Sequence, residues 1–104
     1  MDFRRKIEDG QFTVTAELCP PKGINLNGFI EKARLLKGWV DGINVTDNQR
    51  SVMRLASIPA AAALLKEGLD PIFQVTCRDR NRIALQSDLL GAYSLGLRNV
   101  LALT

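Results

Sequence analysis

The sequence of 104 residues contains no histidine. The commonest general base and metal ligand of enzymes is therefore missing from the chain. No glycine-rich phosphate or dinucleotide loop follows a predicted strand either. The carboxylates Glu17, Asp47 and Asp79 could hold a hard cation, but they show no metal-binding spacing, so we expect no metal site.

Cysteine and aromatic residues are also scarce. Cys19 and Cys77 lie far apart in the sequence, which indicates two reduced thiols rather than a disulfide framework. The aromatic residues are four phenylalanines, one tryptophan and one tyrosine, and the net charge is only +3. Because nucleic-acid binding calls for a broad basic stripe or a stacking platform, we predict no nucleic-acid partner.

No apolar run approaches the length of a membrane span, so we predict no membrane partner. The basic residues Arg4, Arg5 and Lys6 are not followed by an apolar stretch, and we expect no signal peptide. The chain is 46% hydrophobic, which suits one globular unit. These features together predict a cytoplasmic protein.

Four apolar segments rich in β-forming residues recur at intervals of roughly thirty residues, the length of a strand–helix–strand unit. They are residues 12–18, 40–45, 71–75 and 99–103. In the first, Val14, Ala16 and Leu18 alternate with polar residues, which predicts a strand with two different faces. Two prolines follow and end that strand.

Three helical stretches separate the predicted strands. The first covers about 27–37, and the second begins near Ser57, a predicted N-cap, and ends at Gly68. The third follows Asn81, another predicted N-cap, and ends at Gly96. Its predicted buried face consists of Leu85, Leu89, Ala92 and Leu95.

This alternation predicts an α/β fold with parallel strands, for which a doubly wound sheet and a (β/α)8 barrel both fit. A full barrel needs about 250 residues, so we expect about four strands and three helices, half of a TIM-type barrel. Because the sequence stops at Thr104, we expect one partial barrel domain over 1–104, truncated after strand four. The open edge of that strand predicts self-association or a partner chain.

Each predicted strand ends in polar residues, and parallel strands bring such ends to one rim. Thr46, Gln74 and Thr76 could hold a planar polar heterocycle. Glu17 is a candidate proton donor if partial burial favours its neutral form. The alternative is a solvent-facing carboxylate near Lys22, or an ion pair with a rim arginine such as Arg78.

Four segments in order resemble the methylenetetrahydrofolate reductase family and cover nearly the whole chain. They are Phe12-x-Val14-x-Ala16-Glu17-x-x-Pro20-Pro21-Lys22-Gly23, Asp41-Gly42-Ile43-Asn44-Val45-Thr46-Asp47, Gln74-Val75-Thr76-Cys77-Arg78-Asp79-Arg80-Asn81 and Gly96-Leu97-x-Asn99-Val100-Leu101-Ala102-Leu103-Thr104. The resemblance implies a flavin-binding (β/α)8 barrel that reduces 5,10-methylenetetrahydrofolate to 5-methyltetrahydrofolate. It implies a bound flavin, FAD in preference to FMN, with NADH or NADPH as the reductant.

By the same resemblance, Glu17 is the general acid, and Thr46, Gln74 and Thr104 contact the flavin. Asp47-Asn48-Gln49 departs from the family's Tyr-Gly-Ala, and the sequence stops before the family's Gly-Asp pair. We therefore expect the isolated chain to be inactive unless further strands are supplied. Two rival functions remain: a non-catalytic half-barrel for binding or assembly, and a barrel enzyme that acts on pterins without flavin.

Overall fold

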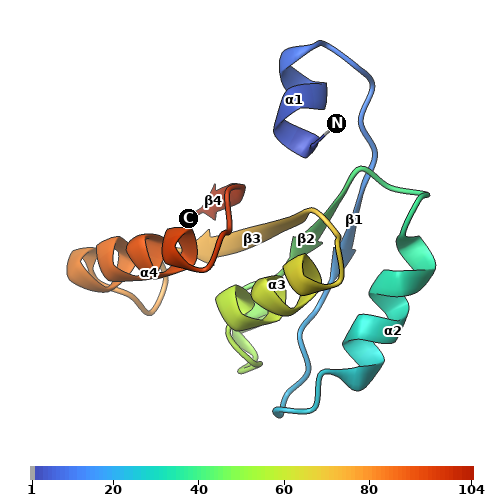
Figure 1. The fold of residues 1–104 in the computed structure, drawn as a ribbon. Helices are drawn as coiled ribbons and strands as arrows, with labels where there is room; N and C mark the ends of the chain where they lie inside the picture. The colour runs from blue at the N-terminus through green and yellow to red at the C-terminus, as the bar shows by residue number, and fades with distance from the viewer. Residues whose placement is uncertain (1) are drawn as a thin grey trace.

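The computed structural model describes residues 2–104 and contains one parallel sheet with helices packed against it (Figure 1). The strands lie in the sheet in sequence order: β1 (Thr15–Leu18), β2 (Gly42–Val45), β3 (Pro71–Thr76) and β4 (Val100–Leu103). They are joined by helices α2 (Asn27–Leu36), α3 (Ser57–Lys66) and α4 (Arg82–Ser94). Helix α1 (Phe3–Glu8) precedes β1, and the short 3-10 helix η1 (Gln49–Ser51) follows β2.

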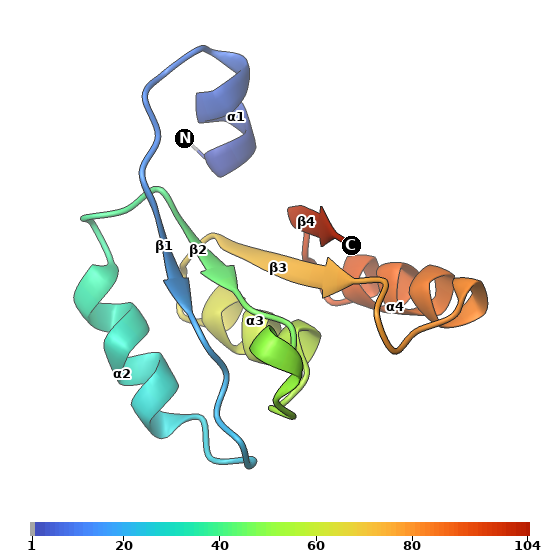
Figure 2. The same cartoon turned by 180° about the vertical axis from the view of Figure 1, so that it is seen from behind.

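The strand order distinguishes the two architectures that the sequence left open. All three strand pairs are parallel and join neighbours in sequence, and the connecting helices lie on one side of the sheet (Figure 2). A doubly wound sheet carries helices on both faces, whereas a TIM-type barrel keeps them outside a sequentially ordered sheet. The predicted α/β fold of four parallel strands is confirmed, in an arrangement consistent with a partial barrel. Met1 lies outside the described residues, and the domain limits 1–104 stay a prediction.

The core lies between the helices and one face of the sheet. Alternate strand residues point to this face, as expected for a pleated strand. The core residues from the strands are Ile43, Val45, Phe73 and Val75, and those from the helices are Phe29, Ala33, Ala60, Ala61, Leu64 and Ala92. The opposite face of the sheet is therefore free to carry polar side chains.

Of the two predicted N-caps, Asn81 is confirmed and Ser57 is wrong. Asn81 does cap α4, because its Oδ1 accepts a hydrogen bond from the N–H of Ala84 at 2.8 Å. Ser57 is not an N-cap; the cap is Ala56, and the Ser57 hydroxyl instead donates to the carbonyl of Gln74 at 2.8 Å.

The predicted buried face of α4 is also only partly correct. Ala92 is 1% exposed, but Leu89 and Leu95 are 43% and 52% exposed. Leu95 lines a groove between α4 and the start of α3, and Leu89 lines a second hollow beside Phe73 and Val100, so neither leucine is buried. None of the helices within residues 2–104 combines the length and the apolar composition needed to cross a membrane.

Helix α1 was not predicted and covers the amino end of the sheet. Asp2 caps it by accepting a hydrogen bond from the N–H of Arg5 at 2.8 Å. Its Phe3 ring lies against Gly42 of β2, where an added Cβ would come within 3.2 Å of that ring. Gly42 is therefore required by close packing between α1 and the sheet.

Candidate functional site

The face of the sheet opposite the helices carries a polar cluster near its carboxyl end. We call it the inner face. The strand register and the alternation of side chains assign to it Thr15, Glu17, Asn44, Ile72, Gln74, Thr76, Leu101 and Leu103. In a barrel this face lines the interior, and functional groups gather at its carboxyl end.

Glu17 on β1 contacts Gln74 on β3 across the intervening strand. The Gln74 side-chain amide donates to Oε2 of Glu17 over 3.3 Å. Glu17 is exposed, whereas Gln74 is only 7% exposed. The alternative ion pair with Arg78 does not form, because Arg78 donates to the carbonyl of Asn48 at 2.9 Å and pairs with Asp79.

Thr46 supplies a buried hydroxyl that has no partner. Its backbone N–H donates to the carbonyl of Leu18 at 3.2 Å, which extends the β1–β2 ladder by one residue and places Thr46 level with Gln74. The residue is 1% exposed, and its Oγ1 has no hydrogen-bond partner within residues 2–104. Leaving such a group unsatisfied costs about 1–3 kcal/mol. A ligand with hydrogen-bonding groups, as a flavin has, would satisfy it.

Three of the four predicted site residues lie close together, and Thr104 lies apart from them. Glu17, Thr46 and Gln74 lie together on adjacent strands. Thr104 follows β4 at the same edge, where it is exposed and out of phase with Leu101 and Leu103 of the inner face. The catalytic and flavin-binding roles of all four residues stay predictions.

A buried ion pair lies beside this cluster. Arg80 donates to both carboxylate oxygens of Asp47, at 2.5 and 2.9 Å, and the Asp47 side chain is 0% exposed. Thr76 adds its N–H at 2.8 Å and its hydroxyl at 3.1 Å. Burial alone would raise the pKa of Asp47, but these hydrogen bonds outweigh it and hold the pKa below its ordinary value. The ends of β2 and β3 are thereby joined.

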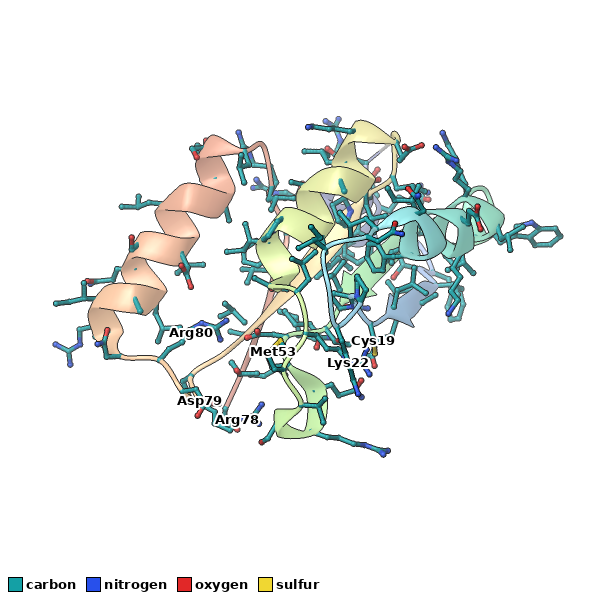
Figure 3. The ribbon with its side chains drawn as sticks, turned by 90° about the horizontal axis from the view of Figure 1, so that it is seen from below. Cys19, Lys22, Met53, Arg78, Asp79 and Arg80 are labelled. Atoms are coloured by element: carbon teal, nitrogen blue, oxygen red, sulfur yellow. The ribbon has the colours of Figure 1, made fainter. Side chains whose placement is uncertain are left out.

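The loops after β1, β2 and β3 meet at this edge (Figure 3). Cys19 donates through its thiol to Gln49 at 3.1 Å, and Arg54 donates to the carbonyl of Pro20 at 3.1 Å. The non-glycine residues of 2–104 with positive φ all lie in these loops: Asn48, Arg50, Ser51 and Asp79. Left-handed backbone of this kind is costly for residues with a Cβ and persists where surrounding contacts enforce it.

Sequence reasoning did not find the pairing of Asp47 with Arg80. The available signal was an acidic residue just after the second strand and an arginine just after the third, both on one predicted rim. The Asp47 carboxylate accepts hydrogen bonds from Arg80 and Thr76. It therefore forms no carboxylate cluster with Glu17 or Asp79. Within residues 2–104 there is no group of three or more side chains placed to hold a metal ion.

Comparison with known proteins agrees with the fold. No curated protein matches the chain. The family model for methylenetetrahydrofolate reductase matches residues 2–104, so nearly every residue is covered. The chain therefore belongs to the methylenetetrahydrofolate reductase family.

Proposed function

We propose that the protein takes part in the flavin-dependent reduction of 5,10-methylenetetrahydrofolate to 5-methyltetrahydrofolate. One observation carries the proposal: the buried, unpartnered hydroxyl of Thr46 lies level with Gln74, whose amide contacts Glu17. A buried hydroxyl that lacks a partner and an exposed carboxyl group thus lie near the same end of the sheet, which supports a cofactor site beside an acid. Family membership supplies the reaction class, that of a reductase.

In this function Glu17 is the proton donor. The Glu17 carboxyl gives its proton to a nitrogen of the five-membered ring of the folate, and a carbon–nitrogen bond of that ring opens to leave an iminium at the methylene carbon. The carboxylate that remains is stabilised by the N–H of Gln74. Glu17 is exposed on the inner face, so a substrate can reach it directly.

Thr46 and Gln74 hold the flavin in this function, and Thr104 adds a weaker contact at the edge. When bound, the flavin, FAD in preference to FMN, supplies the hydride that it has taken from NADH or NADPH.

Both Cys19 and Cys77 are free thiols, which supports the cytoplasm as the site of action.

The exchange of Thr46 for valine tests the cofactor site. Thr46→Val keeps the shape and removes the hydroxyl, so flavin affinity is expected to fall by up to about tenfold, the effect of one hydrogen bond. The ligand-free protein is expected to gain about 1 kcal/mol of unfolding free energy, because a buried unsatisfied group has gone. Flavin fluorescence titration and urea denaturation measure the two effects.

Thr15→Val is the matched control. Thr15 lies on the same face below Glu17, and its hydroxyl already accepts a hydrogen bond from Asn44 at 3.1 Å. Flavin affinity should not change in this variant. Equal flavin affinity in Thr46→Val and the parent protein would contradict the proposed cofactor site.

We also propose that the free edge of β4 pairs with a second copy of the chain. The carbonyls of Asn99 and Leu103 accept hydrogen bonds from β3, so the backbone groups of Val100 and Ala102 point to the other edge. The side chains of Leu101 and Leu103 are each 41% exposed beside it. An unpaired ladder of this kind favours strand addition.

Ala102→Pro is expected to reduce this association. Proline removes an outward N–H and leaves the donors that face β3 intact. Sedimentation velocity should show a larger assembly for the parent chain and a smaller one for the variant, with Ala102→Gly as the control that keeps the N–H. A parent chain that sediments as a monomer would overturn the proposed pairing.

A further inference from the structure

We propose that Gln74 is a positioning residue for Glu17, and that it holds the carboxyl group on the inner face in both of its protonation states. This inference rests on the proposed function, in which Glu17 starts protonated and ends ionised. It extends that function because it assigns Gln74 a second task besides contact with the cofactor. The evidence is the hydrogen bond between the Gln74 amide and the Glu17 carboxylate, over 3.3 Å.

Gln74 is anchored through its backbone, and its side chain is buried. Its backbone lies in β3, paired with Leu101 of β4, and its carbonyl accepts the Ser57 hydroxyl at 2.8 Å. The residue is 7% exposed. The amide group therefore reaches Glu17 from a fixed base, and its main freedom is rotation about its own last bond.

Glu17 depends on this contact because other partners are lacking. Among residues 2–104 no lysine or arginine forms an ion pair with it, and Gln74 makes the hydrogen bond to its carboxylate. The nearby charges Asp47 and Arg80 are paired with each other. An exposed glutamate with a single neutral partner would otherwise sample many rotamers.

A glutamine amide suits both forms of the acid. It carries two N–H donors and one carbonyl acceptor. In the structure the N–H group donates to Oε2 of Glu17, a contact that suits the ionised carboxylate. A protonated Glu17 can donate its O–H to the amide carbonyl after a half-turn of the amide. A lysine or arginine at position 74 would favour only the ionised form, since each is a donor alone.

The half-turn also couples the protonation state of Glu17 to the group, donor or acceptor, that Gln74 offers to a bound cofactor. While the N–H donates to an ionised Glu17, the amide carbonyl is left to accept a hydrogen bond from a bound ligand. While the carbonyl faces a protonated Glu17, the N–H groups are presented instead. Gln74 thus offers an acceptor or a donor to a bound ligand according to the state of the acid.

The first test needs no ligand and no activity. In the ¹⁵N spectrum of the ligand-free chain, the side-chain amide of Gln74 is identified by its loss in Gln74→Met. Glu17→Ala is expected to move this signal and to speed its hydrogen exchange. The side-chain amide of Asn44, which donates to Thr15 on the same face, is the internal control and should not move. An unmoved Gln74 signal would overturn the inference.

The second test is a double-mutant cycle on the flavin-loaded protein in its assembled form. Gln74→Met conserves volume, so it is expected to fold. It should slow the folate half-reaction by about tenfold or more, the effect of losing a hydrogen bond to a charged group. In a Glu17→Gln background it should have little further effect, because Gln74 acts through Glu17.

The outcomes separate this inference from the function on which it rests. Equal slowing by Gln74→Met in both backgrounds would reject the positioning role and leave Glu17 as the acid. A folate half-reaction unaffected by Glu17→Gln would reject the acid itself, whatever the ¹⁵N spectrum shows. Flavin reduction by the nicotinamide is measured alongside in each variant, and only slowing of the folate half-reaction beyond any slowing of flavin reduction counts as the positioning effect.

Discussion

Asp47→Ala is expected to cost about 3–5 kcal/mol of unfolding free energy, the usual penalty for removing one partner of a buried ion pair. The Asp47 side chain is 0% exposed and that of Arg80 is 19% exposed, so the variant leaves the guanidinium with the more exposed Asp88, at 3.4 Å, as its remaining acidic partner. Domains of ordinary stability have about 5–15 kcal/mol in total, so this loss is a substantial fraction of the unfolding free energy. Urea denaturation followed by circular dichroism measures the loss.

Glu67→Ala is the matched control. Glu67 also accepts two hydrogen bonds from an arginine, Arg34, but that arginine is 58% exposed at the outer surface. Surface pairs contribute little, so a much smaller loss is expected. The double exchange Asp47→Leu with Arg80→Met should recover part of the stability lost in Asp47→Ala, because an apolar pair leaves no buried charge, although the Thr76 N–H loses its acceptor. A loss in Asp47→Ala no larger than in Glu67→Ala would show that the pair is not buried as described.

The pH dependence of this effect has a definite sign. The pKa of Asp47 is lowered in the folded protein, so its contribution is complete above the unfolded-state pKa of about 3.9. The contribution is lost as the pH falls through the folded-state pKa. The stability difference between the parent protein and Asp47→Ala is therefore expected to narrow below about pH 4. A difference that stays constant down to pH 2 would contradict the ion pair.

Glu17→Gln is expected to slow the folate half-reaction by about 10²–10⁴-fold, the usual contribution of a general acid. Glutamine keeps the size and polarity of the side chain and lacks the transferable proton. Reduction of the flavin by the nicotinamide does not use this proton and should keep its rate. Stopped-flow absorbance of the flavin separates the two half-reactions in the assembled protein.

Glu31→Gln is the control for this experiment. Glu31 is an exposed glutamate on α2, on the helical side of the sheet. Its exchange should leave both half-reactions unchanged. A Glu17→Gln protein that reduces folate at the parent rate would remove the acid from the mechanism, and the non-catalytic binding or assembly function would then be favoured.

The parts of the fold that follow local rules could be predicted from the sequence. The alternation in residues 12–18 predicted β1, although the observed strand begins later, at Thr15. Asn81 predicted the start of α4, because an asparagine before a helical stretch caps free N–H groups. Gly68 and Gly96 predicted the helix ends, and both adopt the left-handed backbone, with φ of 78° and 94°.

The features that depend on register between distant strands could not be predicted. The pairing of Asp47 with Arg80 requires β2 and β3 to align so that both loops leave the sheet at one level. The lack of a partner for the Thr46 hydroxyl is a property of its surroundings, which no local pattern encodes. Helix α1 escaped prediction because its six residues are too few to show an amphipathic period.

The contacts across the sheet also determine when the site can form during synthesis. Glu17 and Gln74 are separated by 57 residues and Asp47 and Arg80 by 33 residues, since every parallel pairing needs a helical crossover. As the chain leaves the ribosome, Glu17 emerges well before its partner, and Asp47 stays hydrated until the loop after β3 follows. The site is thus assembled late, by contacts that are slow to form. A nascent chain halted before β3 would carry the acid without the residue that orients it.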